Sequence, residues 1–555
     1  MTDLTIAQSV VLQPIQKIAA RLGIDQDDLE LYGKYKAKLP LHLINAERMA
    51  QSNLILVTAL TPTPAGEGKT TVSIGLNEGL NKIGKQSIVV LREPSLGPVF
   101  GIKGGAAGGG YSQVVPMEDI NLHFTGDFAA IEKANNLLAA IIDNIIQTPN
   151  HPIRIDPRTV VWKRVMDLND RSLREIIIGI GGKANGTMRS DGFNITAASE
   201  VMAILCMATS LSDLKTKLGN IFVGFTYEGA PVYAHQLKVQ GAMAILLREA
   251  IKPNLVQTLA GNPAIIHGGP FANIAQGTNT ILATRMGLSL ADYVVTEAGF
   301  GADLGAEKFM NLKCGYGGLS PKAMVIVATI RALRHHGGAS ATDLNTPDTT
   351  KVAAGFANLA KHLENARKFG INPVVAINHF VSDSPEEIAL VQSLCANMGV
   401  VAVLSEGWAK GGDGTTALAQ AVVESIESGN NQFRKLYDWA QPIKEKIAII
   451  AREIYGADGV DYATKAEADL RRINKLGLSD LPICMAKTQK SFSDNEKLIG
   501  RPTHFRVTVR EFELAAGAGF VIPILGNMMR MPGLPAIPAS EGMDIDNNGV
   551  ITGLS

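Results

Sequence analysis

The sequence has few cysteines and no excess of charge of either sign. Its four cysteines are far apart and form no C-x-x-C pair; they are Cys206, Cys314, Cys395 and Cys484. This spacing argues against a disulfide framework or a zinc knuckle and is typical of reduced thiols in a cytoplasmic protein. Lys+Arg and Asp+Glu both number 52, so no electrostatic footprint for nucleic acid or an anionic membrane is expected.

Long hydrophobic runs and repeats are also missing. No run of about 18 uncharged apolar residues is present to span a bilayer. The N-terminus lacks a basic region followed by an apolar core, so we expect no signal peptide and a cytoplasmic location. No repeat period of a solenoid is evident. A chain of 555 residues is too long for one ordinary core, and about two to four domains are expected.

Glycine is abundant, and one glycine-containing stretch organises the chain. Thr61-Pro-Thr-Pro-Ala-Gly-Glu-Gly-Lys-Thr-Thr71 follows an apolar run over 54–57 and precedes a segment with helical spacing. Strand, glycine loop, Lys-Thr and helix form the layout of a phosphate-binding P-loop. Thr63 stands where the standard pattern has glycine. The alternative is an ordinary strand-turn-helix with a surface lysine.

The chemistry of a P-loop assigns roles within this stretch. Lys69 would reach the β and γ phosphates of ATP, and the Thr70 hydroxyl would hold Mg²⁺. The residues expected to bind the nucleotide are Thr63, Pro64, Ala65, Gly66, Glu67, Gly68, Lys69, Thr70 and Thr71.

A second buried strand is predicted over 87–91, and it ends in Arg92-Glu93. Ligands of open α/β sheets gather at the carboxyl ends of the strands. If this strand lies beside the P-loop strand, Arg92 is next to the triphosphate and can hold a γ-phosphate or a small second anion. The alternative is an ion pair between Arg92 and Glu93.

Two further segments have both a structural and a functional interpretation. Gly101-Ile-Lys-Gly-Gly-Ala-Ala-Gly-Gly-Gly-Tyr111 is either a flexible linker or, as we favour, a structured loop at a site. Asp127 precedes a helical pattern over 128–147, where the structural role is that of an N-cap.

The stretch over 154–174 is rich in basic residues. It is either a solvated face of ion pairs or a site for a polyanionic substrate tail. Its basic residues, which alternate with acidic ones, are Arg154, Arg158, Lys163, Arg164, Arg171 and Arg174.

The pattern of apolar runs predicts an α/β fold. Strands and helices alternate over 176–330, as in a P-loop NTPase-like parallel sheet with helices on both faces, and we assign this domain to residues 1–340. A second α/β domain, 351–500, has strands over 373–377 and 400–404, and a small C-terminal subdomain covers 501–555. If these two strands are adjacent and parallel, Phe380 and Trp408 stand side by side and can clamp a flat ring.

These motifs resemble one family, the formate–tetrahydrofolate ligases. Its P-loop reads Thr-Pro-Ala-Gly-Glu-Gly-Lys-Thr, as here, and its two signatures resemble the glycine-rich 101–111 and Val327-Ala-Thr-Ile-Arg-Ala-Leu-Arg-His-His-Gly-Gly338. The resemblance extends along the whole chain. It implies a homotetrameric enzyme that makes 10-formyltetrahydrofolate, ADP and phosphate from formate, ATP and tetrahydrofolate through formyl phosphate, with stimulation by K⁺ or NH₄⁺.

The resemblance also implies roles for particular residues. Lys69, Arg92 and Asp127 would be catalytic, and Phe300 would be a further aromatic at the nucleotide. Phe380, Leu404 and Trp408 would bind the folate, and Thr70 and Glu93 would bind cations. The basic stretch over 154–174 would meet the glutamate tail of a polyglutamylated folate.

Two other functions are compatible with a P-loop. One is a ligase that activates a carboxylate or CO₂ as a mixed anhydride, as dethiobiotin synthetase does, but the chain is far longer than this needs. The other is a partitioning or targeting ATPase, which needs a basic patch or a terminal amphipathic helix, and neither is evident. Affinity for a folate separates both from the ligase.

Overall fold

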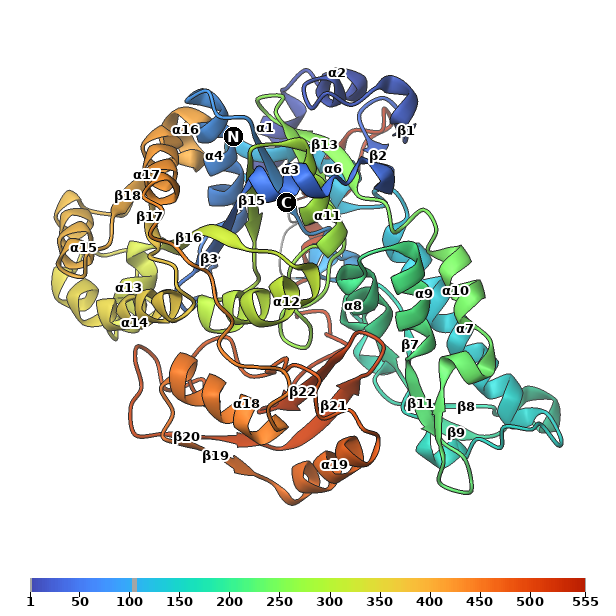
Figure 1. The fold of residues 1–555 in the computed structure, drawn as a ribbon. Coiled ribbons are helices and arrows are strands. Elements are labelled where there is room, and N and C mark those ends of the chain that lie inside the picture. The colour runs from blue at the N-terminus through green and yellow to red at the C-terminus, as the bar shows by residue number, and fades with distance from the viewer. Residues whose placement is uncertain (1, 102–106, 555) are drawn as a thin grey trace.

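The computed structural model describes residues 2–101 and 107–554, and its centre is one large, mostly parallel sheet (Figure 1). Its strand order is β1-β2-β13-β14-β4-β15-β3-β16-β17-β18. The parallel strands are β14 (Pro263–Ile266), β4 (Ser87–Leu91), β15 (Tyr293–Glu297), β3 (Asn53–Ala59), β16 (Pro321–Ala328), β17 (Val374–Asn378) and β18 (Ala402–Ser405). The antiparallel part contains β1 (Glu30–Leu31), β2 (Ala37–Lys38), β13 (Asn254–Thr258), β5 (Gly108–Gly109) and β6 (Ser112–Val115).

Both faces of the sheet are buried, because successive residues of its strands enter different cores. On β3, Ile55 and Val57 pack with α4 (Lys69–Lys82), whereas Leu54 and Leu56 pack in the core that includes α11 (Ile281–Leu290). This alternation explains why the central strands are continuous apolar runs. The prediction of helices on both faces is confirmed.

The other helices of the sheet domain include α14 (Thr349–Lys368) and α17 (Thr416–Glu427), which pack over β16 and β17 on its two faces. The rest are α1 (Asp3–Gln8), α2 (Ile15–Ala20), α3 (Ala46–Gln51), α5 (Leu96–Phe100), α6 (Met117–Asn121), α12 (Cys314–Gly317), α13 (Ile330–His336), α15 (Pro385–Asn397) and α16 (Gly407–Lys410). The helical spacing of apolar residues over 5–22 is divided between α1 and α2, because Pro14 lies at the N-cap of α2.

The strands of the expected second α/β domain belong to the same sheet as the P-loop strand. β17 pairs in parallel with β16, and β18 pairs in parallel with β17. Because β17 is buried throughout, it requires a neighbour on each side, and β16 provides one. Residues 351–500 therefore share a sheet with 1–340, and the limits proposed at 340, 351 and 500 remain predictions.

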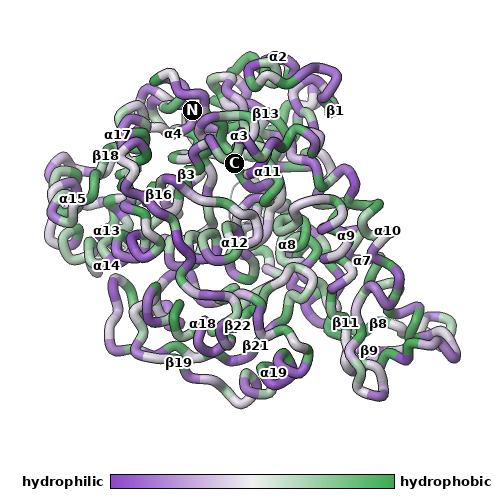
Figure 2. Tube along the Cα trace, viewed as in Figure 1, coloured by the Kyte–Doolittle hydropathy of each residue, from purple (hydrophilic) through white to green (hydrophobic). Residues whose placement is uncertain are grey.

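The prediction of one parallel sheet across 176–330 is wrong at two strands. β8 (Ile176–Ile178) pairs with β9 (Arg189–Asp191), and β11 (Phe222–Phe225) pairs with β12 (Pro231–Tyr233), each antiparallel and outside the central sheet. The connection within each pair is too short for a crossover helix. These pairs form a lobe with β7 (Arg164–Val165), β10 (Phe193–Asn194), α7 (Asp127–Gln147), α8 (Glu200–Met207), α9 (Leu211–Gly219) and α10 (Gln240–Leu246) (Figure 1). Hydrophobic α8 lies in the core of this lobe (Figure 2).

The C-terminal part forms a separate layer beside the sheet domain (Figure 1). In it β20 (Arg506–Val509) pairs with β19 (Gly459–Tyr462), and β22 (Phe520–Ile524) pairs with β21 (Glu511–Ala515). Helices α18 (Ile443–Ile450) and α19 (Thr464–Lys475) complete the layer, and a last short pair joins β23 (Asp544–Ile545) to β24 (Ile551–Thr552). Among the described residues, no helix is both long and apolar enough to cross a membrane.

Candidate active site

The loop predicted to be a P-loop connects β3 to α4 at the carboxyl edge of the sheet, so the predicted order of strand, glycine loop and helix is confirmed. Gly66 and Gly68 have φ of 76° and 74°, which only glycine adopts without strain. A Cβ on Gly68 would lie 2.4 Å from the Asn378 Nδ2 atom, so glycine is also required by packing. Gly68 is the N-cap of α4, whose free amides and dipole favour a phosphate at this end.

Thr63, the departure from the standard pattern, ties the loop to Glu67. The Thr63 amide and hydroxyl donate to Glu67 Oε1 at 2.7 and 2.9 Å, and the Thr329 hydroxyl donates to Glu67 Oε2 at 2.5 Å. The Glu67 carboxylate is buried and accepts three hydrogen bonds. Glu67 therefore fixes the shape of the loop with its side chain.

The P-loop and the end of β4 meet through Glu297, the last residue of β15. The Thr70 hydroxyl donates to Glu297 Oε2 at 2.8 Å, and Arg92 Nη2 lies 3.9 Å from Glu297 Oε1. Arg92 does not lie on a strand next to β3, as the sequence suggested, because β15 is inserted between β3 and β4. Glu297 nevertheless brings Arg92 and Thr70 to one place.

The Arg92 side chain lies at the carboxyl edge of the sheet and, among the described residues, does not pair with the neighbouring Glu93. Within the described part of the chain, its ion pair is with Glu297 and not with Glu93, so that alternative is wrong. The Arg92 Nε atom is buried and has no hydrogen-bond partner among the described residues. The guanidinium thus retains donors for an anion. The sequence did not single out Glu297, although an acidic residue that ends an apolar strand is a usable signal.

Asp127 is the first residue of α7, and its N-cap is Gly126, so the expected N-cap role is wrong. Its carboxylate instead accepts from Lys38 Nζ at 2.5 Å and from Asn254 Nδ2 at 2.9 Å. Both members of the Lys38–Asp127 ion pair are buried. The sequence gave no sign of Lys38, because it lies in a two-residue strand about 90 residues before its partner.

Glu93 lies close to this ion pair and is itself buried. Burial, and then the negative charge of Asp127, raise the pKa of Glu93 well above its usual range. Its Oε2 atom lacks a hydrogen-bond partner among the described residues. Glu93 also lines a small cavity of about 260 Å³ with Glu132 and Asp167, and burial raises the pKa of Asp167 to about 6.

The predicted aromatic pair follows two adjacent parallel strands. In the β17–β18 register Asn378 is opposite Ser405, and Phe380 and Trp408 follow these two ends. Phe380 and Leu404 are half-buried, whereas Trp408 is 49% exposed. Their position at one sheet edge is confirmed; whether they bind a folate stays a prediction.

The described part of the glycine-rich loop packs against Trp408. The Tyr111 amide donates to the Trp408 carbonyl at 2.9 Å, and a Cβ on Gly110 would lie 2.7 Å from Trp408 Cγ. Residues 102–106 of this loop lie outside the described residues. The described glycines therefore serve close approach to the candidate ring site.

Phe300 follows β15 in the loop that begins after Glu297. Its φ of 60° is rare for a bulky residue, and such backbone strain is concentrated at functional sites. Phe300 thus follows a strand that pairs in parallel with β3, and its nucleotide-binding role stays a prediction.

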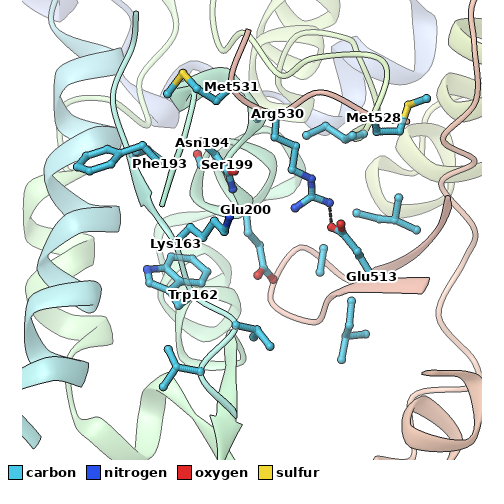
Figure 3. Close-up of a pocket in the computed structure, with 18 of the residues that line it drawn as sticks. Trp162, Lys163, Phe193, Asn194, Ser199, Glu200, Glu513, Met528, Arg530 and Met531 are labelled. Atoms are coloured by element: carbon cyan, nitrogen blue, oxygen red, sulfur yellow. Dashed lines mark ion pairs between the residues drawn. The ribbon is translucent and has the colours of Figure 1, made fainter. Parts of the chain in front are cut away.

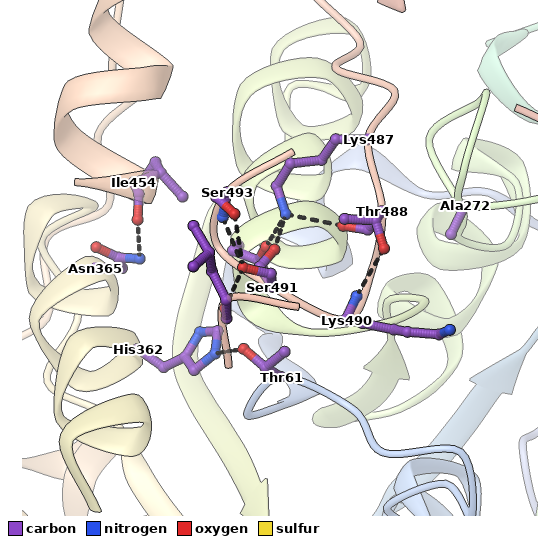
Figure 4. Close-up of polar contacts among 12 residues, drawn as sticks. Thr61, Ala272, His362, Asn365, Ile454, Lys487, Thr488, Lys490, Ser491 and Ser493 are labelled. Carbon is purple, nitrogen blue, oxygen red and sulfur yellow. Dashed lines mark hydrogen bonds and ion pairs between the residues drawn. The ribbon is translucent and has the colours of Figure 1, made fainter. Parts of the chain in front are cut away.

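A buried polar layer supports the start of the P-loop (Figure 4). His362 Nε2 lies 3.0 Å from the Thr61 hydroxyl, and His336 Nε2 donates to the Thr61 carbonyl at 2.8 Å. Burial lowers the pKa of His336 to about 4 and that of His362 to about 3, so both rings are neutral. Beside them Lys487 donates to Asp303 at 2.8 Å and to the Ser491 carbonyl.

The basic stretch over 154–174 is distant from the aromatic pair. Helix α16 and strand β7 lie on opposite sides of the molecule in Figure 1. Four of its basic residues have acidic partners: Arg154 with Glu228, Arg158 with Asp156, Lys163 with Glu175, and Arg164 with Asp143 and Asp191. These contacts are those of a face of ion pairs.

A cavity of about 1010 Å³ also lies on that side (Figure 3). It separates the Trp162 and Glu200 region from the C-terminal layer, where Arg530 pairs with Glu513. None of its lining residues belongs to the P-loop, to the Arg92 segment or to the aromatic pair. The candidate site is therefore the sheet edge and not this cavity.

The comparison with known protein families identifies the family of the whole chain. The model described as formate–tetrahydrofolate ligase matches residues 1–555. A match over the whole chain sets aside the mixed-anhydride ligase of another kind and the partitioning ATPase. The chain therefore belongs to the formate–tetrahydrofolate ligase family, ATP-dependent enzymes that join formate to tetrahydrofolate.

Proposed function

We propose that the reaction proceeds through formyl phosphate. A formate oxygen attacks the γ-phosphorus of ATP and ADP leaves; the N10 amine of tetrahydrofolate then attacks the formyl carbon, and phosphate leaves with loss of the N10 proton. The observation that carries this proposal is the meeting of Arg92 and Thr70 at Glu297. It provides an anion-binding group beside the loop that would hold the γ-phosphate.

The nucleotide would bind to the P-loop residues 63–71, with Lys69 at the β and γ phosphates and Phe300 nearby. The Thr70 hydroxyl and the Glu297 carboxylate supply oxygen ligands of the kind that Mg²⁺ prefers. No larger cluster of metal-ligating side chains occurs among the described residues, which fits an ion held mainly by phosphate oxygens. When bound, Mg²⁺ neutralises charge on the phosphates.

Arg92 would bind formate and bring it to the γ-phosphate. Formate and a triphosphate repel each other, and fixed cations at the reacting atoms are the main means by which enzymes lower such a barrier. The planar guanidinium matches a carboxylate with two parallel hydrogen bonds. Lys69 from the P-loop and Arg92 from β4 would approach the transferred phosphoryl group from two sides.

Asp127 supports the Arg92 segment rather than the substrate itself. Its carboxylate is bound by Lys38 and Asn254 and is buried, so it offers little to a ligand. Its charge acts on Glu93, the residue next to Arg92. We assign Asp127 as a positioning residue near the reacting centre.

Glu93 is the proposed site of the activating K⁺ or NH₄⁺. Its buried Oε2 atom has no hydrogen-bond partner among the described residues, and Glu93 lines a small cavity. A monovalent cation there would neutralise the negative charge of the Glu93 carboxylate, which burial and the neighbouring charge of Asp127 destabilise. We further propose a homotetramer in the cytoplasm.

Phe380, Leu404 and Trp408 would bind the pterin, with the ring between the two aromatic faces. Phe380 and Trp408 follow β17 and β18, and Leu404 lies near the end of β18. Their common position at one sheet edge supports this role. The exposed Trp408 would be covered by the ligand, which accounts for a large apolar side chain in solvent.

The decisive experiment measures ADP release with formate, with and without tetrahydrofolate, together with the formyl product. The proposal expects folate-dependent ADP release matched by 10-formyltetrahydrofolate. Transfer of ¹⁸O from labelled formate to phosphate tests the intermediate, because the formate oxygen that attacks phosphorus leaves with the phosphate. Unlabelled phosphate would refute formyl phosphate.

A further inference from the structure

The first turn of α13 contacts the P-loop and the Phe380 segment at the same time. Arg331 Nη2 donates to the Gly66 carbonyl at 3.3 Å, and the Arg331 guanidinium carbon lies 4.9 Å from the centre of the Phe380 ring. A cation over an aromatic face at this distance is attracted by the ring. One side chain thus joins the tip of the nucleotide loop to one wall of the aromatic pair.

A second link runs parallel to the first. Asn378 Nδ2 donates to the Glu67 carbonyl at 3.1 Å, and Asn378 is the last residue of β17, two positions before Phe380. The contact is tight, because a Cβ on Gly68 would collide with this amide. The P-loop therefore has little freedom to shift without moving the end of β17.

The rest of α13 is held by buried contacts, so the position of Arg331 is well defined. Arg334 pairs with Glu387 at 2.5 Å, and neither side chain is exposed. Arg334 also donates to the Ser382 carbonyl at 3.0 Å, in the loop that carries Phe380. At the far end of α13, His336 holds the Thr61 carbonyl.

The guanidinium of Arg331 is not saturated by these contacts. Arginine has five N–H donors, and the Nε atom of Arg331 is buried without a hydrogen-bond partner in the described part of the chain. A small displacement of the P-loop or of Phe380 can therefore change its hydrogen bonding. A residue that couples the P-loop to Phe380 is expected to change its hydrogen bonds in this way when either one moves.

We propose that Arg331 is a positioning residue that couples the two substrate sites, so that a nucleotide on the P-loop strengthens the binding of folate at Phe380. The inference rests on the proposed function, in which the pterin packs on the Phe380 ring. Phosphates would fix the loop and its Gly66 carbonyl. Arg331 would then hold the Phe380 ring in the orientation that the pterin requires.

The test is the affinity for tetrahydrofolate measured by calorimetry, with and without a non-hydrolysable ATP analogue and without formate. For the wild type we expect the analogue to tighten folate binding about fivefold or more, the lower range of typical couplings. In R331M, which keeps an apolar stem on Phe380 but has no donor and no charge, the ratio should fall to about one. R331K retains a cation and should give an intermediate ratio.

The matched control is R154M, which removes an exposed arginine paired with Glu228 on the distant lobe and should keep the wild-type ratio. The thermal midpoint of each variant checks the fold. A wild-type ratio below about two, or a wild-type ratio retained in R331M, overturns the coupling alone. A wild type that binds no folate overturns the proposed function and this inference with it.

Steady-state kinetics give a second readout that a purely structural role would not produce. R331M should raise the KM for tetrahydrofolate at saturating ATP and leave the KM for formate unchanged. An equal loss for all three substrates would show a general defect of the site and contradict the coupling.

Discussion

The nucleotide half of the site and the aromatic half are built differently. Around the P-loop the polar groups are buried and paired: Glu67 accepts three hydrogen bonds, and Thr61 is held by neutral histidines. At the other half Trp408 is 49% exposed, and Val381 beside Phe380 is fully exposed. A preorganised anion site requires dipoles that are fixed before the ligand binds. A site for a flat ring requires only two aromatic faces, between which the ligand itself fills the space.

We expect the largest effect from a substitution of Lys69, in the nucleotide half of the site. K69A should lower turnover by about a thousandfold, because Lys69 provides a cation at the transferred phosphoryl group. The thermal midpoint should change little, since Lys69 is a half-buried residue at the start of α4. Normal turnover in K69A would remove the P-loop from the mechanism.

Next in size is the loss of Arg92. R92A should reduce kcat/KM for formate about a hundredfold, because the small anion loses its bidentate partner and the charge beside the phosphate. The KM for ATP should change much less. R92K keeps the charge without the planar fork, so its kcat/KM for formate should lie between those of the wild type and R92A. An unchanged dependence on formate in R92A would move this role to another residue.

A substitution of Trp408 tests the aromatic half of the site. W408A should weaken folate binding about tenfold through the lost stacking and leave the affinity for ATP nearly unchanged. Because Trp408 is half exposed, its loss should not destabilise the fold, and W162F in the distant lobe serves as the control. Equal losses for folate and ATP would show that the two halves are not distinct.

The smallest effect concerns the pH dependence of stability. Burial lowers the pKa of His336 from 6.5 to about 4, so the unfolded chain binds a proton at a higher pH than the folded one. This contribution to stability is complete above pH 6.5 and is lost as the pH falls toward 4. H336Q cannot titrate, so its free energy of unfolding, measured in urea, should fall less steeply over this range. Parallel curves would contradict the neutral histidine.

The sequence patterns predicted the structure correctly where all the residues concerned lie close together in the chain. The strand, the two glycines and Lys-Thr of the P-loop lie within about 20 residues, and their backbone angles follow from residue type. The same holds for the apolar runs of β17 and β18, which placed Phe380 and Trp408 correctly. Prediction failed where a partner is distant in sequence, as for Lys38 with Asp127 and Glu297 with Thr70.

By itself, the sequence determined the α/β class, the glycine loop between β3 and α4, the residues at the strand ends and, through its motifs, the family. The tertiary structure decided which strand ends meet: β15 separates β4 from the P-loop strand and brings Glu297 between Arg92 and Thr70. It also decided that Arg331 bridges the P-loop and Phe380. The reason is physical, because residue type fixes backbone preference within a few residues, whereas strand order results from packing both faces of the whole sheet.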